Sequence, residues 1–461
     1  MKKRSIFIGL SIIFSTLSFG QSVQTEKLDS LFASLHEKKS FNGNVLIAEK
    51  GNIVFEKSYG YADESAKRKL DKNTIFELAS VSKQFTAMGI IILKKQGKLN
   101  YDDKISKYIP ELAFYGDISI KNLLNHTSGL PDYMDFFEEK WDKTKFATNQ
   151  DIVSEFAKYK PNVLFKPNEK FEYSNTGYAL LALIIERGSK KSFDKFLTQY
   201  IFKPLKMKNT FVYRSKYEPK KIENYALGYI SDSLGNKVQA NNLEKTLYYY
   251  LDGIVGDGMV NSTVSDLLIW DRALYGNKLV DENDKKLIYQ PSKTTDGKEN
   301  PYGFGWFLSK NTKYGTIVNH TGGWGGYITL IERHLTNDKT IILLQNNALS
   351  STKLPNKEVR KILYNEPLSA EKPLKSVALK SEDLDKYLGL YANEKFPLKI
   401  KVTKKEDVLY TQATGQEEIP MKAYENDTFT FEPANIKVIF NVKDNTFELQ
   451  QGEMKILFKK E

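Results

Sequence analysis

Apolar and polar positions alternate along most of the chain with the periods of regular secondary structure. Residues 25–38 follow a helical period, and residues 44–63 form two β-rich runs on either side of a Lys-Gly-Asn turn. Residues 77–290 are mostly helical with long loops, and residues 316–347 contain at least two further strands. Strands at both ends of a helical middle predict one α+β domain whose sheet joins segments that are distant in the sequence.

The pattern changes in the last quarter of the chain. Residues 355–364 predict a closing helix, and residues 366–380 carry prolines and lysines without periodicity, which is typical of a linker. Residues 381–461 are short alternating runs separated by turn residues, so they predict a small all-β barrel or sandwich. We therefore expect an α+β domain over residues 21–365, followed by a separate C-terminal β-domain.

The first twenty residues differ from the rest. Three basic residues precede an apolar stretch from Ile6 to Phe19, which ends in small residues. This combination predicts a signal peptide over residues 1–20, cleaved after Gly20. The apolar stretch is shorter than the roughly 20 residues that a membrane span needs. We therefore expect a periplasmic or secreted protein with no integral membrane segment once the signal is removed.

Composition and charge exclude several classes of function. Of 461 residues, 41% are hydrophobic, which is ordinary for a globular chain. The absence of cysteine excludes a disulfide framework, a thiolate nucleophile and a lipid-anchored lipoprotein. The formal charge is +11, but basic and acidic residues are well mixed, which predicts a solvated surface and no nucleic-acid partner. No metal-ligand spacing or cofactor motif occurs in the sequence, so we expect no cofactor.

Candidate chemistry begins in the stretch FELASVSKQF. Ser80 and Lys83 are three residues apart at the start of a predicted apolar helix, so they share one helix face. At a helix N-terminus, the backbone N–H of Ser80 is available to an oxyanion, and a nearby lysine can activate the hydroxyl as a nucleophile. Taken alone, this segment is explained more simply by a capping serine beside a surface lysine.

A second motif, Tyr173-Ser174-Asn175, precedes another apolar helix. The tyrosine hydroxyl can transfer protons, and the asparagine amide can bond Lys83 or a substrate carbonyl. Alone, this motif is explained by a helix cap with a neighbouring aromatic residue.

A third motif, His320-Thr321-Gly322-Gly323, lies in a predicted strand. Glycine allows a substrate to approach the strand closely, and the N–H of Gly323 can complete an oxyanion hole. Alone, this motif is explained by a glycine-rich bulge.

In this order, the motifs S-x-x-K, Y-x-N and basic residue-T-G are together highly specific. The sequence resembles the serine β-lactamase and penicillin-binding-protein superfamily, especially its class C-like branch of β-lactamases, D-amino-acid peptidases and esterases. The stretches LLNHTSGLPDY, GDGMVNSTVSDLLIW and YGFGWF are similar as well. The resemblance covers about residues 25–365, and the tail, with Tyr387-x-Gly389-x-Tyr391, resembles the lipocalin-like β-domain often appended to such hydrolases.

The resemblance implies an exported serine hydrolase that cleaves amide or ester bonds through a covalent acyl-enzyme on Ser80. Lys83 is then the hydrogen-bonded activator, and Tyr173 transfers protons to and from the leaving group. Asn175 orients the substrate amide. The other positions that the resemblance assigns to substrate binding are His320, Thr321, Gly322 and Gly323. The implied substrate is a small molecule or a peptide, with D-amino-acid and peptidoglycan-derived peptides as candidates.

The sequence departs from the family pattern at two positions. Asn168 stands where a glycine is usual, and asparagine tolerates the same left-handed conformation. His320 replaces the usual lysine, and an unperturbed histidine is mostly neutral at pH 7, so recognition of a substrate carboxylate is doubtful. This favours esterase or D-aminopeptidase activity. Acidification below about pH 6.5 is expected to charge His320 and to favour substrates with a carboxylate.

Other readings stay open at this point. One is a true class C-type β-lactamase or a D-Ala-D-Ala carboxypeptidase, and another is a non-catalytic envelope protein that binds peptidoglycan or a peptide. Of the remaining histidines, His126 is expected to support a loop, and His36 and His334 are expected on the surface.

Overall fold

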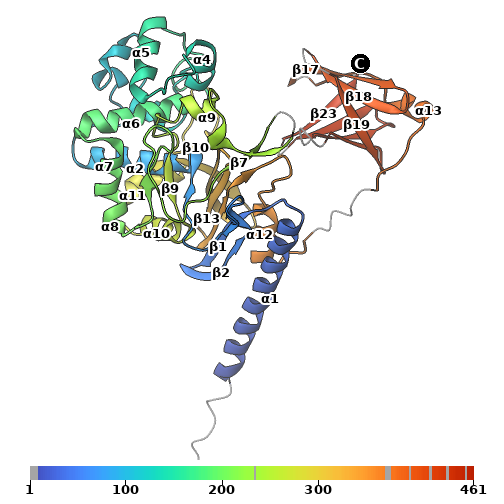
Figure 1. Cartoon of the computed structure of the whole chain (residues 1–461), viewed down its shortest axis with the longest axis horizontal. Coiled ribbons are helices and arrows are strands. Elements are labelled where there is room, and N and C mark those ends of the chain that lie inside the picture. The colour runs from blue at the N-terminus through green and yellow to red at the C-terminus, as the bar shows by residue number, and fades with distance from the viewer. Residues whose placement is uncertain are drawn as a thin grey trace, which may run out of the picture. The chain divides into compact units, whose positions relative to one another are not determined.

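The alternating runs from the two ends of the first domain lie in one antiparallel sheet, ordered β10-β11-β12-β13-β14-β1-β2 (Figure 1). Gly43 lies opposite Gln345, and Glu49 lies opposite Lys339, so the first strand pairs with the last long strand of the domain. The predicted α+β fold, with a sheet that joins distant segments, is confirmed. The strands are β1 Gly43–Glu49, β2 Asn52–Tyr59, β10 Tyr302–Gly303, β11 Trp306–Asn311, β12 Gly315–Trp324, β13 Tyr327–His334 and β14 Lys339–Gln345.

The structure is a computed structural model. It describes residues 9–232, 235–368, 375–393, 396–414, 418–431, 436–451 and 454–461. The chain divides into two compact units, the first ending at Glu366 and the second beginning at Pro367. Short strands of the first unit pair outside the main sheet: β3 Tyr61–Asp63 with β4 Arg68–Lys69, β9 Val260–Ser262 with β5 Phe76–Glu77 and β6 Phe211–Val212, and β7 Tyr229–Ser231 with β8 Lys237–Gln239 and β15 Asn347–Ala348.

Helices α1 (Gly9–Glu37) and α12 (Asn356–Leu363) share one apolar cluster with the sheet. The amphipathic pattern explains this arrangement, because the helices bury Leu28, Phe32 and Val359 and expose their polar positions. The expected surface position of His334 is wrong: its side chain is fully buried and is hydrogen-bonded to Glu332 and Tyr364.

The larger apolar cluster lies between the sheet and the helical region, with α2 and α6 at its centre. Most residues of these two helices are buried, ten of thirteen in α2 and ten of fifteen in α6, which accounts for their largely apolar sequence. The helices of this region are α2 Lys83–Lys95, α3 Ile120–Leu124, α4 Tyr133–Lys140, α5 Asn149–Tyr159, α6 Asn175–Ser189, α7 Phe193–Leu197, α8 Lys203–Leu205, α9 Leu247–Tyr250, α10 Val264–Tyr275 and α11 Glu282–Tyr289.

The second unit is a closed eight-stranded barrel, which confirms the predicted all-β domain. Strand β16 pairs with both β17 and β23, and this second pairing closes the ring. Alternate side chains fill the interior with apolar groups, among them Tyr391, Phe429 and Phe447. The elements are α13 Ser381–Leu384, β16 Gly389–Asn393, β17 Phe396–Lys405, β18 Val408–Ala413, β19 Ile419–Tyr424, β20 Thr428–Phe431, β21 Ile436–Asn441, β22 Thr446–Gln451 and β23 Met454–Lys460.

Parts of two sequence predictions lie outside the described residues. The structure does not describe residues 1–8 of the predicted signal peptide or residues 369–374 of the predicted linker. Within the part of the chain that the structure describes, no helix has both the length and the hydropathy of a membrane span.

Removing residues 367–461 is expected to leave the first unit folded. The described residues that form its two apolar clusters all precede Glu366, so the deletion removes none of this core. The truncated chain should unfold cooperatively on heating, with a midpoint within about 5 °C of the transition of the same unit in the full chain. Calorimetry and size-exclusion chromatography measure this directly. Recovery only as aggregate would contradict independent folding.

Candidate active site

Ser80 lies on a sharp connection between a strand and a buried helix. Strand β5 pairs with β9, and the chain then turns through Ala79, whose φ of +49° is left-handed, into the 3-10 helix Ala79–Ser82 and α2. Strand β12 passes directly beside this turn at Gly322, where any Cβ would collide with the Leu78 carbonyl oxygen. Glycine is therefore needed at position 322 for close approach of the strand, and Ser80 remains partly exposed at the surface of a cavity.

Lys83 is completely buried and makes three hydrogen bonds. Its Nζ lies 2.9 Å from Asn175 Oδ1, 2.9 Å from the Asp257 backbone oxygen and 3.2 Å from Ser80 Oγ. The amide and carbonyl oxygens can only accept, so each takes one N–H of the lysine. The remaining position on Nζ is then directed at Ser80, as a donor in the ammonium form and as a lone pair in the amine form.

Asn175 is oriented by a carboxylate on its other side. Asp132 Oδ2 accepts both the backbone N–H of Asn175, at 2.9 Å, and its side-chain Nδ2, at 3.2 Å. A carboxylate accepts only, so Nδ2 faces Asp132 and Oδ1 must face Lys83. Asp132 also caps α4 through the Met134 N–H, so the loop before α4 fixes the orientation of this amide.

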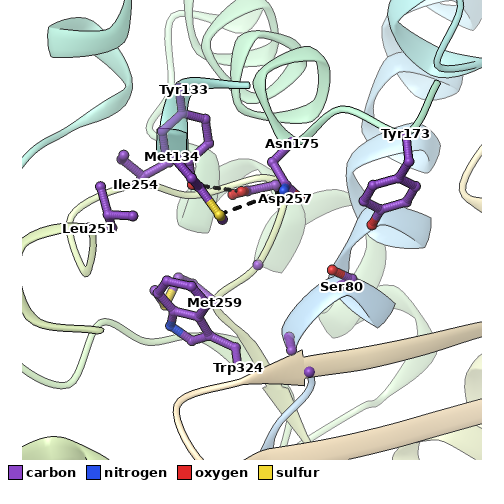
Figure 2. A pocket seen from close by; sticks show the side chains of 13 residues that line it. Ser80, Tyr133, Met134, Tyr173, Asn175, Leu251, Ile254, Asp257, Met259 and Trp324 are labelled. Atoms are coloured by element: carbon purple, nitrogen blue, oxygen red, sulfur yellow. Dashed lines mark hydrogen bonds between the residues drawn. The ribbon is translucent and has the colours of Figure 1, made fainter. Parts of the chain in front are cut away.

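Tyr173 is held by its ring, which leaves its hydroxyl unoccupied. The ring is parallel to Phe307 within 8° and lies 4.3 Å from the His126 ring. His126 Nδ1 accepts the backbone N–H of Ser174, which confirms the expectation that His126 supports a loop. The buried Tyr173 hydroxyl has no hydrogen-bond partner among the described residues, and Figure 2 shows it directed toward Ser80. It is therefore free to exchange a proton with a group bound at Ser80.

A cavity of about 280 Å3 opens at Ser80. Gly323 and Trp324 at the end of β12 form one wall, and Asn175 lies on another. In Figure 2, Tyr173 lies on one side of Ser80, and the apolar part of the cavity extends on the other side. This apolar part is lined by Met134, Leu251, Ile254, Met259 and Trp324.

His320 lies behind this wall and does not contribute to it. Its side chain is 1% exposed, Nδ1 lies 2.6 Å from the Thr321 carbonyl oxygen, and Nε2 lies 2.9 Å from the Tyr302 hydroxyl. Because a carbonyl only accepts, Nδ1 carries the proton, and Nε2 accepts from Tyr302. Of the four residues of the third motif, only Gly323 lines the cavity; Thr321 is exposed, and Gly322 packs under Ala79.

Burial and the nearby charge of Lys83 lower the pKa of His320 to about 3. The expectation that His320 becomes charged below about pH 6.5 is therefore wrong. The sequence analysis expected a mostly neutral imidazole at pH 7, and the lowered pKa agrees with this. The lowered pKa also reduces the stability of the fold in acid. In the unfolded chain this histidine takes up a proton near pH 6.5, but in the folded chain it does so only near pH 3. The free energy of unfolding therefore decreases as the pH falls from 6.5 to about 3.

As far as His320 is concerned, we expect the preference between substrates with and without a carboxylate to be insensitive to moderate acid. The ratio of kcat/KM for nitrocefin, which carries a free carboxylate, to kcat/KM for p-nitrophenyl acetate should change by less than about twofold between pH 8 and pH 5, since His320 stays neutral throughout. Steady-state kinetics with both substrates at each pH measures this ratio and cancels losses common to both. A tenfold rise toward pH 5 would mean that a histidine charges within reach of the substrate.

The sequence analysis did not select two acidic residues of the site. Asp132 orients Asn175, and Asp257 contributes its backbone oxygen to Lys83 and its side chain to the cavity wall. Both lie in stretches that resemble the family, LLNHTSGLPDY and GDGMVNSTVSDLLIW, so a signal was present. Asn168 has the predicted left-handed conformation, with φ of +68°, and donates its N–H to the Thr127 carbonyl oxygen.

The fold and the Ser-Lys-Tyr arrangement define a class of serine hydrolases, and comparison with known proteins agrees. The β-lactamase family model matches residues 28–363, so the chain belongs to the β-lactamase family. It is 40% identical over 426 residues to "Penicillin-binding protein 4*" of Bacillus subtilis (strain 168), covering 91% of this chain and 94% of that protein. It is 29% identical to protein flp of Staphylococcus aureus (strain MW2), covering 70% of this chain and 63% of that protein.

Two solved structures are similar over most of the chain. The octameric penicillin-binding protein homologue from Pyrococcus abyssi has a TM-score of 0.64 and 25% identity, covering 94% of this chain and 99% of that one. The D-amino acid amidase from Ochrobactrum anthropi SV3 has a TM-score of 0.59 and 26% identity, covering 75% of this chain and 96% of that one. The protein is therefore a serine hydrolase of the β-lactamase and penicillin-binding-protein type.

Proposed function

We propose that this protein is an exported hydrolase that forms an acyl-enzyme on Ser80 and cleaves amide or ester bonds of substrates without a required carboxylate. The observation that carries the proposal is the position of Ser80 between the directed Nζ of Lys83 and the unpartnered hydroxyl of Tyr173. The predicted signal peptide at residues 1–20 supports export.

In the acylation step, Lys83 in its amine form accepts the Ser80 proton while Ser80 Oγ attacks the substrate carbonyl. The backbone N–H groups of Ser80 and Gly323 stabilise the oxyanion that forms. The bond to the leaving group then breaks, and Tyr173 gives this group its proton. Tyr173 then recovers the proton that Lys83 took from Ser80, and both groups return to their starting forms. In deacylation, Tyr173 and Lys83 accept a proton from a water molecule as its oxygen attacks the ester carbonyl. The bond to Ser80 Oγ then breaks, and the same proton passes to Oγ, which releases the acid and restores the Ser80 hydroxyl.

The substrate class follows from the charge of the cavity. His320 is neutral and buried, and Lys83 is turned toward Asn175 and Asp257, so no fixed cation is available to a substrate carboxylate among the described residues of the cavity wall. Similarity to a D-amino acid amidase supports amides and esters of D-amino acids as substrates. Short esters and D-amino-acid amides should then be better substrates than penicillins.

Similarity to penicillin-binding proteins favours a second candidate, a β-lactamase or D-Ala-D-Ala carboxypeptidase. A panel of p-nitrophenyl esters, D-phenylalanine amide, nitrocefin and a D-Ala-D-Ala peptide distinguishes the two, using the mature protein. The proposal expects kcat/KM to be highest for an ester or an amide. If nitrocefin or the peptide were the best substrate, the second candidate would be favoured. If no substrate were turned over and Ser80 were not labelled, the protein would bind its ligand without catalysis.

A further inference from the structure

The two sides of Ser80 have different roles under the proposed function, on which this inference rests. Tyr173 protonates the leaving group, so the leaving group must lie on the Tyr173 side of Ser80. The acyl group then extends to the opposite side, into the apolar part of the cavity (Figure 2). The residues that line this part therefore select the acyl group of the substrate.

A single carboxyl group faces the acyl group. Thirteen described residues line the cavity, and among them Asp257 is the only acid and none is a lysine or an arginine. Asp257 is 6% exposed, and its neighbours along the wall include Leu251, Ile254 and Met259. A carboxyl group on an otherwise apolar wall is costly to bury, unless a partner of opposite charge binds there.

The protein itself supplies little compensation for this carboxyl. Asp257 Oδ2 accepts the Tyr133 hydroxyl at 2.8 Å, and the ion pairs between described residues do not include Asp257. Lys83 bonds the backbone oxygen of Asp257 and not its carboxylate. Burial accordingly raises the pKa of Asp257, and the charge of Lys83 only partly opposes this shift.

We infer that Asp257 binds the amino group of the substrate's acyl part, so that the preferred substrates are α-amino acyl esters and amides with an apolar side chain. An ammonium group beside Oδ1 or Oδ2 supplies the missing positive partner, and the surrounding apolar wall accepts the side chain. The charge of the cavity thus favours substrates with an amino group and gives no advantage to substrates with a carboxylate.

The test compares two matched esters, D-phenylalanine methyl ester and methyl 3-phenylpropanoate, which differ only in the amino group. We measure kcat/KM for both with the wild type and with Asp257→Asn at pH 6.5, where an α-amino group is largely protonated. The ratio of amino to des-amino ester should fall about 10- to 100-fold in Asp257→Asn, as expected for loss of a charged hydrogen bond. The ratio cancels any loss of turnover that affects both esters.

Asp252→Asn is the matched control. Asp252 is buried in the same loop but accepts the backbone N–H groups of Lys216 and Tyr217 and does not line the cavity. In Asp252→Asn, the ratio of kcat/KM for the amino ester to kcat/KM for the des-amino ester should remain within about twofold of the wild-type ratio, as expected for a group that does not contact substrate. An equal fall in both variants would overturn the inference, because the effect would then be a general result of altering this loop.

A pH series on the wild type provides a test that does not depend on the folding of a variant. Burial raises the pKa of Asp257, and protonation removes its charge, so the ratio of amino to des-amino ester should fall as the pH is lowered. Lys83, Tyr133, Asp132 and the buried Glu77 also interact with Asp257. A change in one of these groups that alters turnover in general affects both esters, and it therefore cancels in their ratio.

The outcomes separate the two proposals. Turnover of both esters that persists in Ser80→Ala, or that is absent from the wild type, defeats the proposed function itself. Turnover that depends on Ser80, with a ratio that changes less than twofold in Asp257→Asn and with pH, leaves the proposed function standing and overturns the role of Asp257.

Discussion

Replacing Ser80 with alanine is expected to abolish hydrolysis, with a loss in kcat/KM of about 1000-fold or more on every substrate that the wild type cleaves. Among the described residues, the Ser80 hydroxyl is the only nucleophile in contact with Lys83 Nζ, and the unpartnered Tyr173 hydroxyl is directed at the same position. The substitution removes one partly exposed oxygen, so the fold should not change. Steady-state kinetics, together with mass spectrometry after incubation with a fluorescent phosphonate, measures both turnover and loss of covalent labelling.

The matched control is Ser82→Ala, two residues further along. Ser82 is fully buried and turned away from the cavity, where its Oγ accepts the Val260 backbone N–H at 3.0 Å. Removing this acceptor should cost about 1–3 kcal/mol of stability, because it leaves a buried donor unsatisfied, but covalent labelling should persist. If Ser82→Ala were the inactive variant and Ser80→Ala were not, the assignment of the nucleophile would be wrong.

Replacing Lys83 with methionine is expected to reduce the rate of Ser80 acylation on the order of 1000-fold. Methionine fills much of the same buried volume, but it offers neither a donor to Asn175 Oδ1 nor a lone pair to the Ser80 proton. The fold should persist with reduced stability, because the Asn175 Oδ1 and Asp257 carbonyl acceptors lose their donor, at a cost of about 1–3 kcal/mol each. Stopped-flow or burst kinetics with a p-nitrophenyl ester separates acylation from deacylation.

Lys94→Met is the matched control for this prediction. Lys94 lies in the same helix, α2, in its last turn and partly exposed, with its ammonium near the Tyr101 ring. It makes no contact with Ser80, so acylation should be unchanged within about twofold. Acylation by Lys83→Met at the wild-type rate would show that another group, with Tyr173 as first candidate, activates Ser80.

Local features of the site were predictable from the sequence. A separation of three residues at a helix start determines that Ser80 and Lys83 share a face, whatever surrounds them. Asn168 was recognised as a position for the left-handed conformation, and it has this conformation in the structure. Gly322 was expected to admit a substrate, but the group that approaches it closely is the Leu78 carbonyl oxygen. The alternating runs likewise predicted the sheet and the barrel, because strand periodicity reflects only which side of a strand is buried.

Charge and burial at the site depended on contacts that the sequence does not reveal. His320 looked like a cavity residue that titrates near pH 6.5, but the tertiary structure surrounds it with Tyr302, Phe307 and Tyr173, and burial lowers its pKa to about 3. His334 likewise appears isolated in the sequence, yet in the structure it is buried, stacks on Tyr364 and is hydrogen-bonded to Tyr364 and Glu332. A pKa depends on every charge and dipole nearby, and most of these come from distant parts of the chain.

The sequence alone determined the class of fold, the family and the order Ser80, Lys83, Tyr173 along the chain, since these follow from local periodicity and from residue types at short spacings. The tertiary structure alone decided which oxygens hold Lys83, which side of Ser80 accepts the acyl group, and that Asp257 is the carboxyl in the cavity. Asn175 and Asp257, whose oxygens hold Lys83, are 92 and 174 residues away from it in the sequence. Such long-range contacts depend on the packing of the whole domain, and a local sequence pattern carries no information about them.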